Sequence, residues 1–131
     1  MLRIWFTLII LCLGCQTVES PLERPWVPPD EPGAFEVGRT TLYFRDVRDK
    51  PLVVDVWYPA IVSDDDVRSI YEPTNYRGRS FQDAELDLRY GAHPLVAFSH
   101  GYVSIRFQSF YLMEHLASHG FVVLSVDHNW N

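Results

Sequence analysis

Cysteine is almost absent from this sequence. Its 131 residues include two cysteines, Cys12 and Cys15, and both lie close to the N-terminus. The sequence after residue 15 therefore holds no disulfide, no thiolate nucleophile and no zinc site built from thiolates.

Basic residues are also scarce. Eleven Lys and Arg stand against 17 Asp and Glu, which gives a net charge of -6. Proteins that bind nucleic acid neutralise phosphates with clustered Lys and Arg, and the sequence has no such cluster. We therefore expect no nucleic-acid partner. The hydrophobic content of 47% is sufficient for one core and typical of a single globular domain.

No apolar run is long enough to span a membrane. The stretch from Ile4 to Gly14 has 11 residues, and as a helix it would reach about 16 Å, roughly half of a bilayer core. Arg3 precedes this stretch. Residues 1–15 therefore have the pattern of a signal peptide.

The end of this segment, Leu13-Gly14-Cys15, resembles a bacterial lipoprotein signal. The resemblance implies that Cys15 is lipidated and that the protein is anchored to a membrane of the bacterial cell envelope. Ordinary export with cleavage nearby, giving a secreted or periplasmic protein, is the alternative. Residues 16–33 contain five prolines and are expected to form an extended tether.

The domain is expected to occupy residues 34–131. Two strand-like segments, Phe35–Phe44 and Pro51–Ala60, flank a charged turn and predict an antiparallel hairpin. In the second segment Asp55 is expected on the outer face of a half-buried strand. Residues 61–93 show little pattern, and we expect a long surface excursion with at most a short helix. The acidic run Asp64–Asp66 lacks the spaced ligands of a calcium loop and is expected to be solvated.

The last part of the sequence has the pattern of a βαβ unit. Pro94–Ser99 and Phe121–Val126 are continuous apolar runs, as in strands buried on both faces of a parallel sheet. Between them, Arg106–His119 carries apolar residues at helical spacing, and Gly120 is expected to end the helix in the left-handed conformation. The fold class is therefore expected to be α/β.

Both strands of this unit end in polar sequence, Ser99–Tyr102 and Asp127–Trp130. Ligands of open α/β sheets bind at the carboxyl ends of the strands, so these loops are expected to line one cleft, with Gly101, His128 and Trp130 as substrate-binding residues. Gly101 would let the backbone turn sharply. The backbone amide of Tyr102 could then point at an oxygen, the kind of donor that stabilises a developing oxyanion.

Three segments together resemble the N-terminal part of the α/β-hydrolases: Asp55–Ala60, His93–Gly101 and Glu114–Val123. The likeness covers roughly residues 40–131 and is greatest to the branch of platelet-activating factor acetylhydrolase and dienelactone hydrolase. In that family the loop after His-Gly lends one backbone amide to the oxyanion hole, and Tyr102 occupies that position. The resemblance implies hydrolysis of a small-molecule or lipid ester by a serine nucleophile, with no cofactor and no metal.

The catalytic serine of such an enzyme is not in this sequence. Its Gly-x-Ser-x-Gly elbow, followed by an acid and a His, comes after the oxyanion loop, and no such elbow occurs here. In the hydrolase strand order, Pro94–Ser99 would also become an apolar, unpaired edge. We therefore expect a fragment of a serine ester hydrolase that is inactive alone. The alternative is a non-catalytic exported lipoprotein that binds a partner; a flavodoxin-like nucleotide module is a weaker one, because His-Gly-Tyr-Val is a poor phosphate loop.

Several polar residues suggest other sites. His115 and His119 have the i, i+4 spacing of zinc ligands on a helix, but no third ligand is evident and we expect polar residues of the helix surface. His100 is expected to brace neighbouring loops. Asp127 and His128 are adjacent, yet neighbours at the end of a strand point to opposite sides, so a catalytic dyad is not expected.

Overall fold

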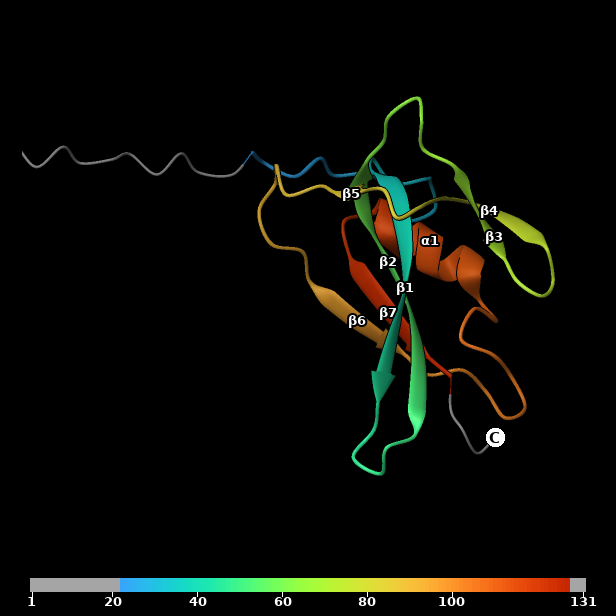
Figure 1. Cartoon of the computed structure of the whole chain (residues 1–131). Helices are drawn as coiled ribbons and strands as arrows, with labels where there is room; N and C mark the ends of the chain where they lie inside the picture. The colour runs from blue at the N-terminus through green and yellow to red at the C-terminus, as the bar shows by residue number, and fades with distance from the viewer. Residues whose placement is uncertain (1–21, 128–131) are drawn as a thin grey trace, which may run out of the picture.

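A computed structural model of the chain describes residues 22–127. These residues form one mixed sheet and one helix (Figure 1). The sheet order is β3-β4-β1-β2-β7-β6, and the short β5 pairs with β2 beside this path. The elements are β1 (Glu36–Arg45), β2 (Pro51–Ile61), β3 (Arg68–Tyr71), β4 (Tyr76–Gln82), β5 (Glu85–Leu86), β6 (Leu95–Phe98), α1 (Phe110–Ser118) and β7 (Val122–Val126).

The predicted hairpin is confirmed. β1 and β2 pair antiparallel along their whole length, from Glu36 opposite Ala60 to Arg45 opposite Pro51. The turn is closed by Asp46, whose carboxylate accepts hydrogen bonds from the backbone amides of Arg48 and Lys50 at 2.8 and 2.9 Å. The bond from Lys50 is the main reason why the pKa of Asp46 lies below its usual value.

The surface excursion expected over residues 61–93 is wrong. Three strands within it extend the sheet: β3 and β4 pair antiparallel, β4 pairs parallel with β1, and β5 pairs antiparallel with β2. The alternation in β3 is hidden in the sequence because Ser69 and Tyr71 are its buried residues while Ile70 faces out. A polar serine in the core and an exposed isoleucine obscure the usual pattern of a strand.

The βαβ unit is confirmed. β6 and β7 pair parallel, with Val96 opposite Val123, and α1 connects them. The helix begins at Phe110 rather than at Arg106, since residues 106–109 form turns before it. Gly120 follows the helix with a φ of +93°, the left-handed conformation that the sequence predicted.

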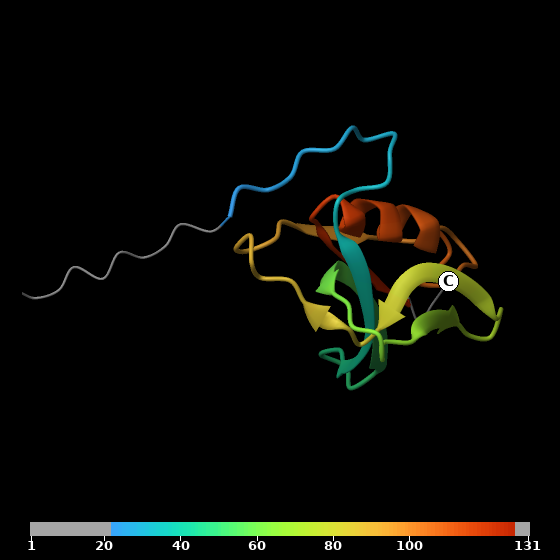
Figure 2. The same cartoon turned by 90° about the horizontal axis from the view of Figure 1, so that it is seen from above.

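The helix α1 covers one face of the sheet (Figure 2). The main core lies between them and is built from the fully buried Trp57, Met113, Ala117 and Val123, together with Phe107. The opposite face holds a smaller cluster around Tyr58, Ala60 and Ala84. Because residues alternate along a strand, neighbouring residues of β2 serve these two separate cores.

Residues 22–34, the described part of the proline-rich segment, run beside α1 (Figure 2). His115 donates from Nε2 to the carbonyl of Pro29 at 2.8 Å, and His119 donates in the same way to Glu31 at 2.9 Å. The amide of Gly33 donates to Ser118 Oγ at 3.0 Å. The two histidines therefore hydrogen-bond backbone carbonyls of the proline-rich segment. Within residues 22–127, no group of three or more His, Cys, Asp or Glu is arranged to bind a metal.

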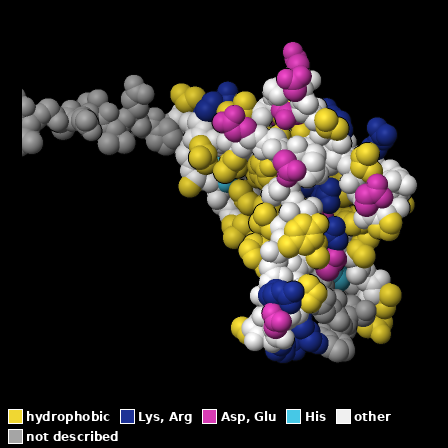
Figure 3. Space-filling view, in the orientation of Figure 1, with side chains coloured by type: hydrophobic (Ala, Val, Ile, Leu, Met, Phe, Trp, Pro, Cys, Tyr) yellow, Lys and Arg dark blue, Asp and Glu magenta, His cyan; other side chains and the backbone are white. Residues whose placement is uncertain are grey.

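β6 forms an edge of the sheet in the described part of the chain, as the strand order predicted. Leu95 is 63% exposed on it, and hydrophobic side chains gather in this region of the face opposite α1 (Figure 3). An apolar edge strand offers unpaired backbone groups to other chains.

Gly120→Ala is expected to lower the free energy of unfolding by about 1–2 kcal/mol, because a Cβ is disfavoured at positive φ. Urea denaturation measures this change. The control is Gly101→Ala: its φ is not positive, and among residues 22–127 an added Cβ would approach Gln108 Oε1 alone, at 3.9 Å. An equal loss of stability in both variants would contradict the conformational explanation.

Candidate functional site

The loop of residues 99–109 and the end of β7 meet at one end of the sheet (Figure 1). The backbone amide of Arg106 donates to Asp127 Oδ1 at 2.7 Å, which joins the two segments directly. The two carboxyl ends therefore lie together as far as Asp127, and the cleft that they were expected to line stays a prediction. His128, Trp130 and Cys15 lie outside the described residues.

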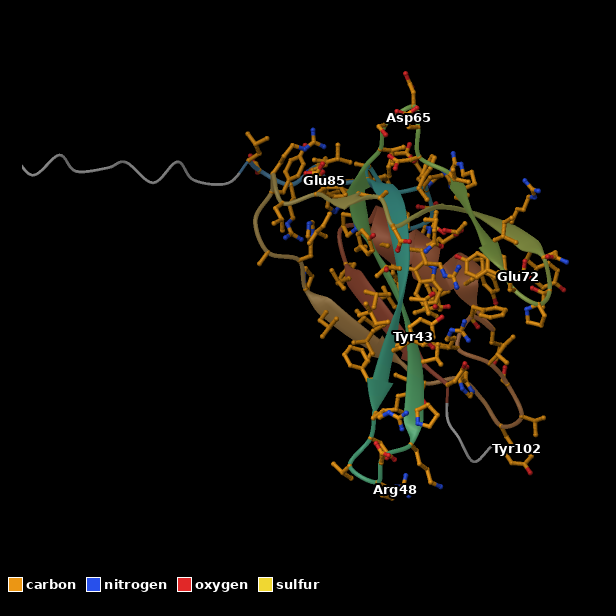
Figure 4. All side chains as sticks on the ribbon, in the orientation of Figure 1. Tyr43, Arg48, Asp65, Glu72, Glu85 and Tyr102 are labelled. Atoms are coloured by element: carbon orange, nitrogen blue, oxygen red, sulfur yellow. The ribbon has the colours of Figure 1, made fainter. Side chains whose placement is uncertain are left out.

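The side chain of Tyr102 points away from the sheet at the outer part of this loop (Figure 4). It is 86% exposed, so its ring does not cover the sheet edge. Among the described residues, the ring of Tyr102 therefore has little packing role. The group to consider at this position is the backbone amide.

His100 determines how the next peptide bond is oriented. Its ring is buried, and its Nδ1 donates to the carbonyl of Gly101 at 2.9 Å. In a trans peptide the C=O and the following N–H point in opposite directions. The carbonyl of Gly101 faces His100, so the amide of Tyr102 faces away from that ring. This contact lies within one turn, so the expectation that His100 braces neighbouring loops stays a prediction.

The two amides at the turn differ in their partners. The Gly101 amide donates to Gln108 Oε1 at 3.3 Å. The Tyr102 amide makes no hydrogen bond to another residue in the range 22–127 and lies eight positions before α1 begins. Of these two amides, the one at Tyr102 is the one left available for a ligand.

The sharp turn does not depend on Gly101 in the way the sequence suggested. Gly101 has no positive φ, whereas Val103 has a φ of +53°. A β-branched residue in this region is strained, and such strain is concentrated at functional sites. The unusual backbone geometry of the loop therefore lies one residue after Tyr102.

A buried network of charges joins this loop to the sheet, and sequence reasoning missed it. Asp55 is fully buried, not on an outer face as expected. Its carboxylate accepts from Arg39 Nη2 and from Thr41 Oγ1, both at 2.7 Å. Arg106 Nε lies 3.1 Å from the same carboxylate. One feature of the sequence could have indicated the network: Asp55 is a lone charge within the apolar run LVVDVW, and a buried charge requires a partner.

The far end of this network is Asp127, whose Oδ2 accepts from Arg106 Nη1 at 2.6 Å. Burial lowers the pKa of Arg106, but the carboxylates of Asp55 and Asp127 outweigh burial and raise the pKa above its usual value. Asp127 thus belongs to an ion pair with Arg106, and its relation to His128 lies outside the described residues.

Ser125, in β7, is fully buried in register with Phe98 and with Asp55. A cavity of about 370 Å³ lies between α1, residues 33–37 and residues 77–79. It contains no residue of the loop 99–109, so it is separate from the turn at Tyr102. Between residues 22 and 127, no helix has the length and apolar character needed to cross a membrane.

Comparison with known proteins gives a family match and matches to solved structures. Residues 69–131 match the family of platelet-activating factor acetylhydrolase, isoform II. The fold is similar to a ferulic acid esterase from Streptomyces cinnamoneus, with a TM-score of 0.65 and 24% sequence identity. The match covers 76% of this chain and 35% of the esterase. No curated protein matches the sequence.

These findings confirm the resemblance read from the sequence. The esterase match shows the fold, and the family match covers β3 to β7, which include the loop of Tyr102 and the βαβ unit. The chain spans about a third of the esterase's length. The described residues therefore form part of an α/β-hydrolase fold, and the sequence is similar over residues 69–131 to the platelet-activating factor acetylhydrolase branch of that superfamily.

Proposed function

We propose that this chain contributes an oxyanion-binding turn to a serine hydrolase of carboxylic esters, with the backbone amide of Tyr102 as the donor. The observation that carries the proposal is the orientation of one peptide bond. His100 holds the carbonyl of Gly101 at 2.9 Å, so the Tyr102 amide points the opposite way, and no group within residues 22–127 accepts its hydrogen bond.

The chemistry needs such a donor at one step. When a serine oxygen attacks an ester carbonyl, the carbonyl oxygen becomes an anion, and fixed N–H groups stabilise it without reorganisation. The Tyr102 amide suits this task because His100 and Gln108 constrain the backbone before it. The sequence holds no Gly-x-Ser-x-Gly elbow, so the nucleophile, acid and base are assigned to a part of the enzyme outside these 131 residues.

The substrate class and location complete the proposal. The family match favours small-molecule esters with a short acyl group, including esters of the phospholipid type. The N-terminal pattern favours export and lipidation at Cys15, which would place the enzyme on a membrane of the cell envelope next to lipid esters. His128 and Trp130, which follow Asp127 directly, are proposed to line the substrate cleft.

A second function is favoured by one observation. The sequence lacks a serine elbow, and its two most suggestive polar residues, Asp127 and His100, are engaged by Arg106 and by the Gly101 carbonyl. These features also fit a non-catalytic exported lipoprotein whose βαβ unit binds a partner.

One experiment separates the two functions. The protein encoded by the complete gene and the 131-residue chain are each assayed with p-nitrophenyl acetate and p-nitrophenyl butyrate. We expect hydrolysis by the former, with inhibition by a serine-directed organophosphonate, and none by the latter. If the complete gene encodes only these 131 residues and they give a soluble, folded and inactive protein, the binding function replaces the hydrolase.

A further inference from the structure

We propose that Arg106 is a positioning residue for the Tyr102 amide, acting by fixing the loop 99–109 against β2 and β7. The inference rests on the proposed function, because it assigns a task to the loop that carries the oxyanion donor. It concerns a residue that makes no contact with the reacting atoms, so its effect is transmitted through the backbone.

Arg106 is held twice by the same carboxylate. Its backbone amide donates to Asp127 Oδ1 at 2.7 Å, and its Nη1 donates to Asp127 Oδ2 at 2.6 Å. Charge-assisted bonds of this kind are about twice as strong as neutral ones and fix direction as well as distance. Both the main chain and the side chain of Arg106 are therefore tied to the end of β7.

A second carboxylate forms an ion pair with the guanidinium, at 3.1 Å but without hydrogen-bond geometry. Asp55 on β2 is fully buried and lies 3.1 Å from Arg106 Nε. Asp55 is itself immobilised by Arg39 and Thr41 from the neighbouring strand β1. Two arginines and two aspartates balance each other, which offsets the cost of removing these charges from water. Arg106 thus docks onto an anion that the sheet has already placed.

The connection from Arg106 to Tyr102 runs through a short turn. The amide of Gln108 donates to the carbonyl of Ile105 at 2.9 Å, so Arg106 lies inside the turn that carries Gln108. Gln108 Oε1 in turn accepts from the amide of Gly101, the residue before Tyr102. Release of Arg106 would free this turn and remove one of the two constraints on the Gly101–Tyr102 peptide.

The pair Arg48–Asp46, in which the arginine side chain is exposed, provides the matched control. It is also an ion pair, at 2.9 Å, and Arg48 lies at the tip of the β1–β2 turn (Figure 4). The hydrogen bonds that Asp46 and Arg48 make to other described residues all stay within residues 46–50. An Arg→Gln change there removes the same charge without touching the loop 99–109.

The test uses the protein encoded by the complete gene, with Arg106→Gln, Arg106→Lys and Arg48→Gln. We expect Arg106→Gln to lower kcat for p-nitrophenyl butyrate by about tenfold with KM changed less than about twofold, since a small displacement of a catalytic group acts on the transition state. Arg106→Lys should recover part of the loss, because it restores charge but not the planar fork. Arg48→Gln should match the wild type.

A second measurement observes the amide itself. Protein labelled with 15N-tyrosine gives a signal for Tyr102, assigned by its loss in Tyr102→Phe, and its relaxation reports mobility. We expect increased mobility in Arg106→Gln and none in Arg48→Gln. Asp127→Asn serves as the second variant if Arg106→Gln does not fold, with the same expectation.

The outcomes separate the two proposals. An unchanged Tyr102 signal, or an unchanged kcat in an active enzyme, overturns the role of Arg106 and leaves the proposed function standing. An inactive wild-type enzyme overturns the proposed function, and the catalytic role of Arg106 with it. In that case, increased mobility of the Tyr102 amide in Arg106→Gln would show only that Arg106 stabilises the structure of the loop.

Discussion

Replacing Tyr102 by proline is expected to reduce kcat for ester hydrolysis by about 10²- to 10³-fold, the usual cost of losing one oxyanion donor. Proline has no N–H, and its ring would occupy the space into which the amide points. The φ of Tyr102 is not positive, and Gly101 before it tolerates the restriction that proline imposes. The measurement is steady-state hydrolysis of p-nitrophenyl butyrate by the protein that the complete gene encodes.

Tyr102→Ala is the matched control for this prediction. It removes the ring, which is 86% exposed, and keeps the amide. We expect its kcat to stay within about threefold of the wild type, since an exposed side chain contributes little to the fold. Circular dichroism checks that both variants fold. Equal activity of the proline and alanine variants would show that the amide of Tyr102 does not bind the oxyanion.

Removal of the Glu114 carboxylate is expected to give the largest loss of stability. Glu114 is buried on α1, where Oε1 accepts from the amide of Ser80 at 2.9 Å and from the hydroxyl of Tyr71 at 2.8 Å. Oε2 accepts from the amide of Arg79 at 2.9 Å. Glu114→Ala leaves two buried donors and one partly buried donor without their acceptor. This costs about 3–5 kcal/mol in the free energy of unfolding, at roughly 1–3 kcal/mol for each buried donor and less for the donor that water can reach. Urea denaturation measures it.

Two further variants locate the cause of this loss. Glu114→Gln retains Oε1 and loses the acceptor for Arg79 only, so about 1–2 kcal/mol is expected. Glu85→Ala removes an exposed carboxylate of β5, and a change below about 0.5 kcal/mol is expected. If Glu114→Ala destabilised the protein no more than Glu85→Ala, the hydrogen bonds of Glu114 would not be what joins α1 to β4.

The contacts of Glu114 also explain why the predicted surface excursion over residues 61–93 was wrong. Tyr71 donates to Glu114 from the middle of the core and accepts from Trp57 Nε1 at 2.8 Å. Burial, and next the charge of Glu114, raise the pKa of the Tyr71 hydroxyl, so it stays protonated and can donate. These partners lie far apart in the sequence, and local pattern gives no sign that they meet.

In the candidate site, too, some features were predicted from the sequence and others were not. The residues His100, Gly101 and Tyr102 were identified from the sequence, because a polar turn directly after an apolar run is a local feature. The burial on both faces that the run Pro94–Ser99 predicted is wrong, because β6 is an edge strand with exposed and half-buried residues. Arg106 was counted as the first residue of a helix, yet its contacts to Asp55 and Asp127 place it in a turn before α1. Whether the Tyr102 amide was free or bonded was also beyond local reasoning.

The sequence by itself determined the hairpin, the βαβ unit, the left-handed residue after the helix and the position of the turn at Tyr102. Each depends on the spacing of apolar residues or on the chemistry of neighbouring residues, which act over a few positions. Only the tertiary structure decided that Asp55 is buried, that β3 and β4 extend the sheet and that Arg106 joins the loop to two strands. The physical reason is that a buried polar group is stable only beside its partner, and those partners come from distant parts of the chain.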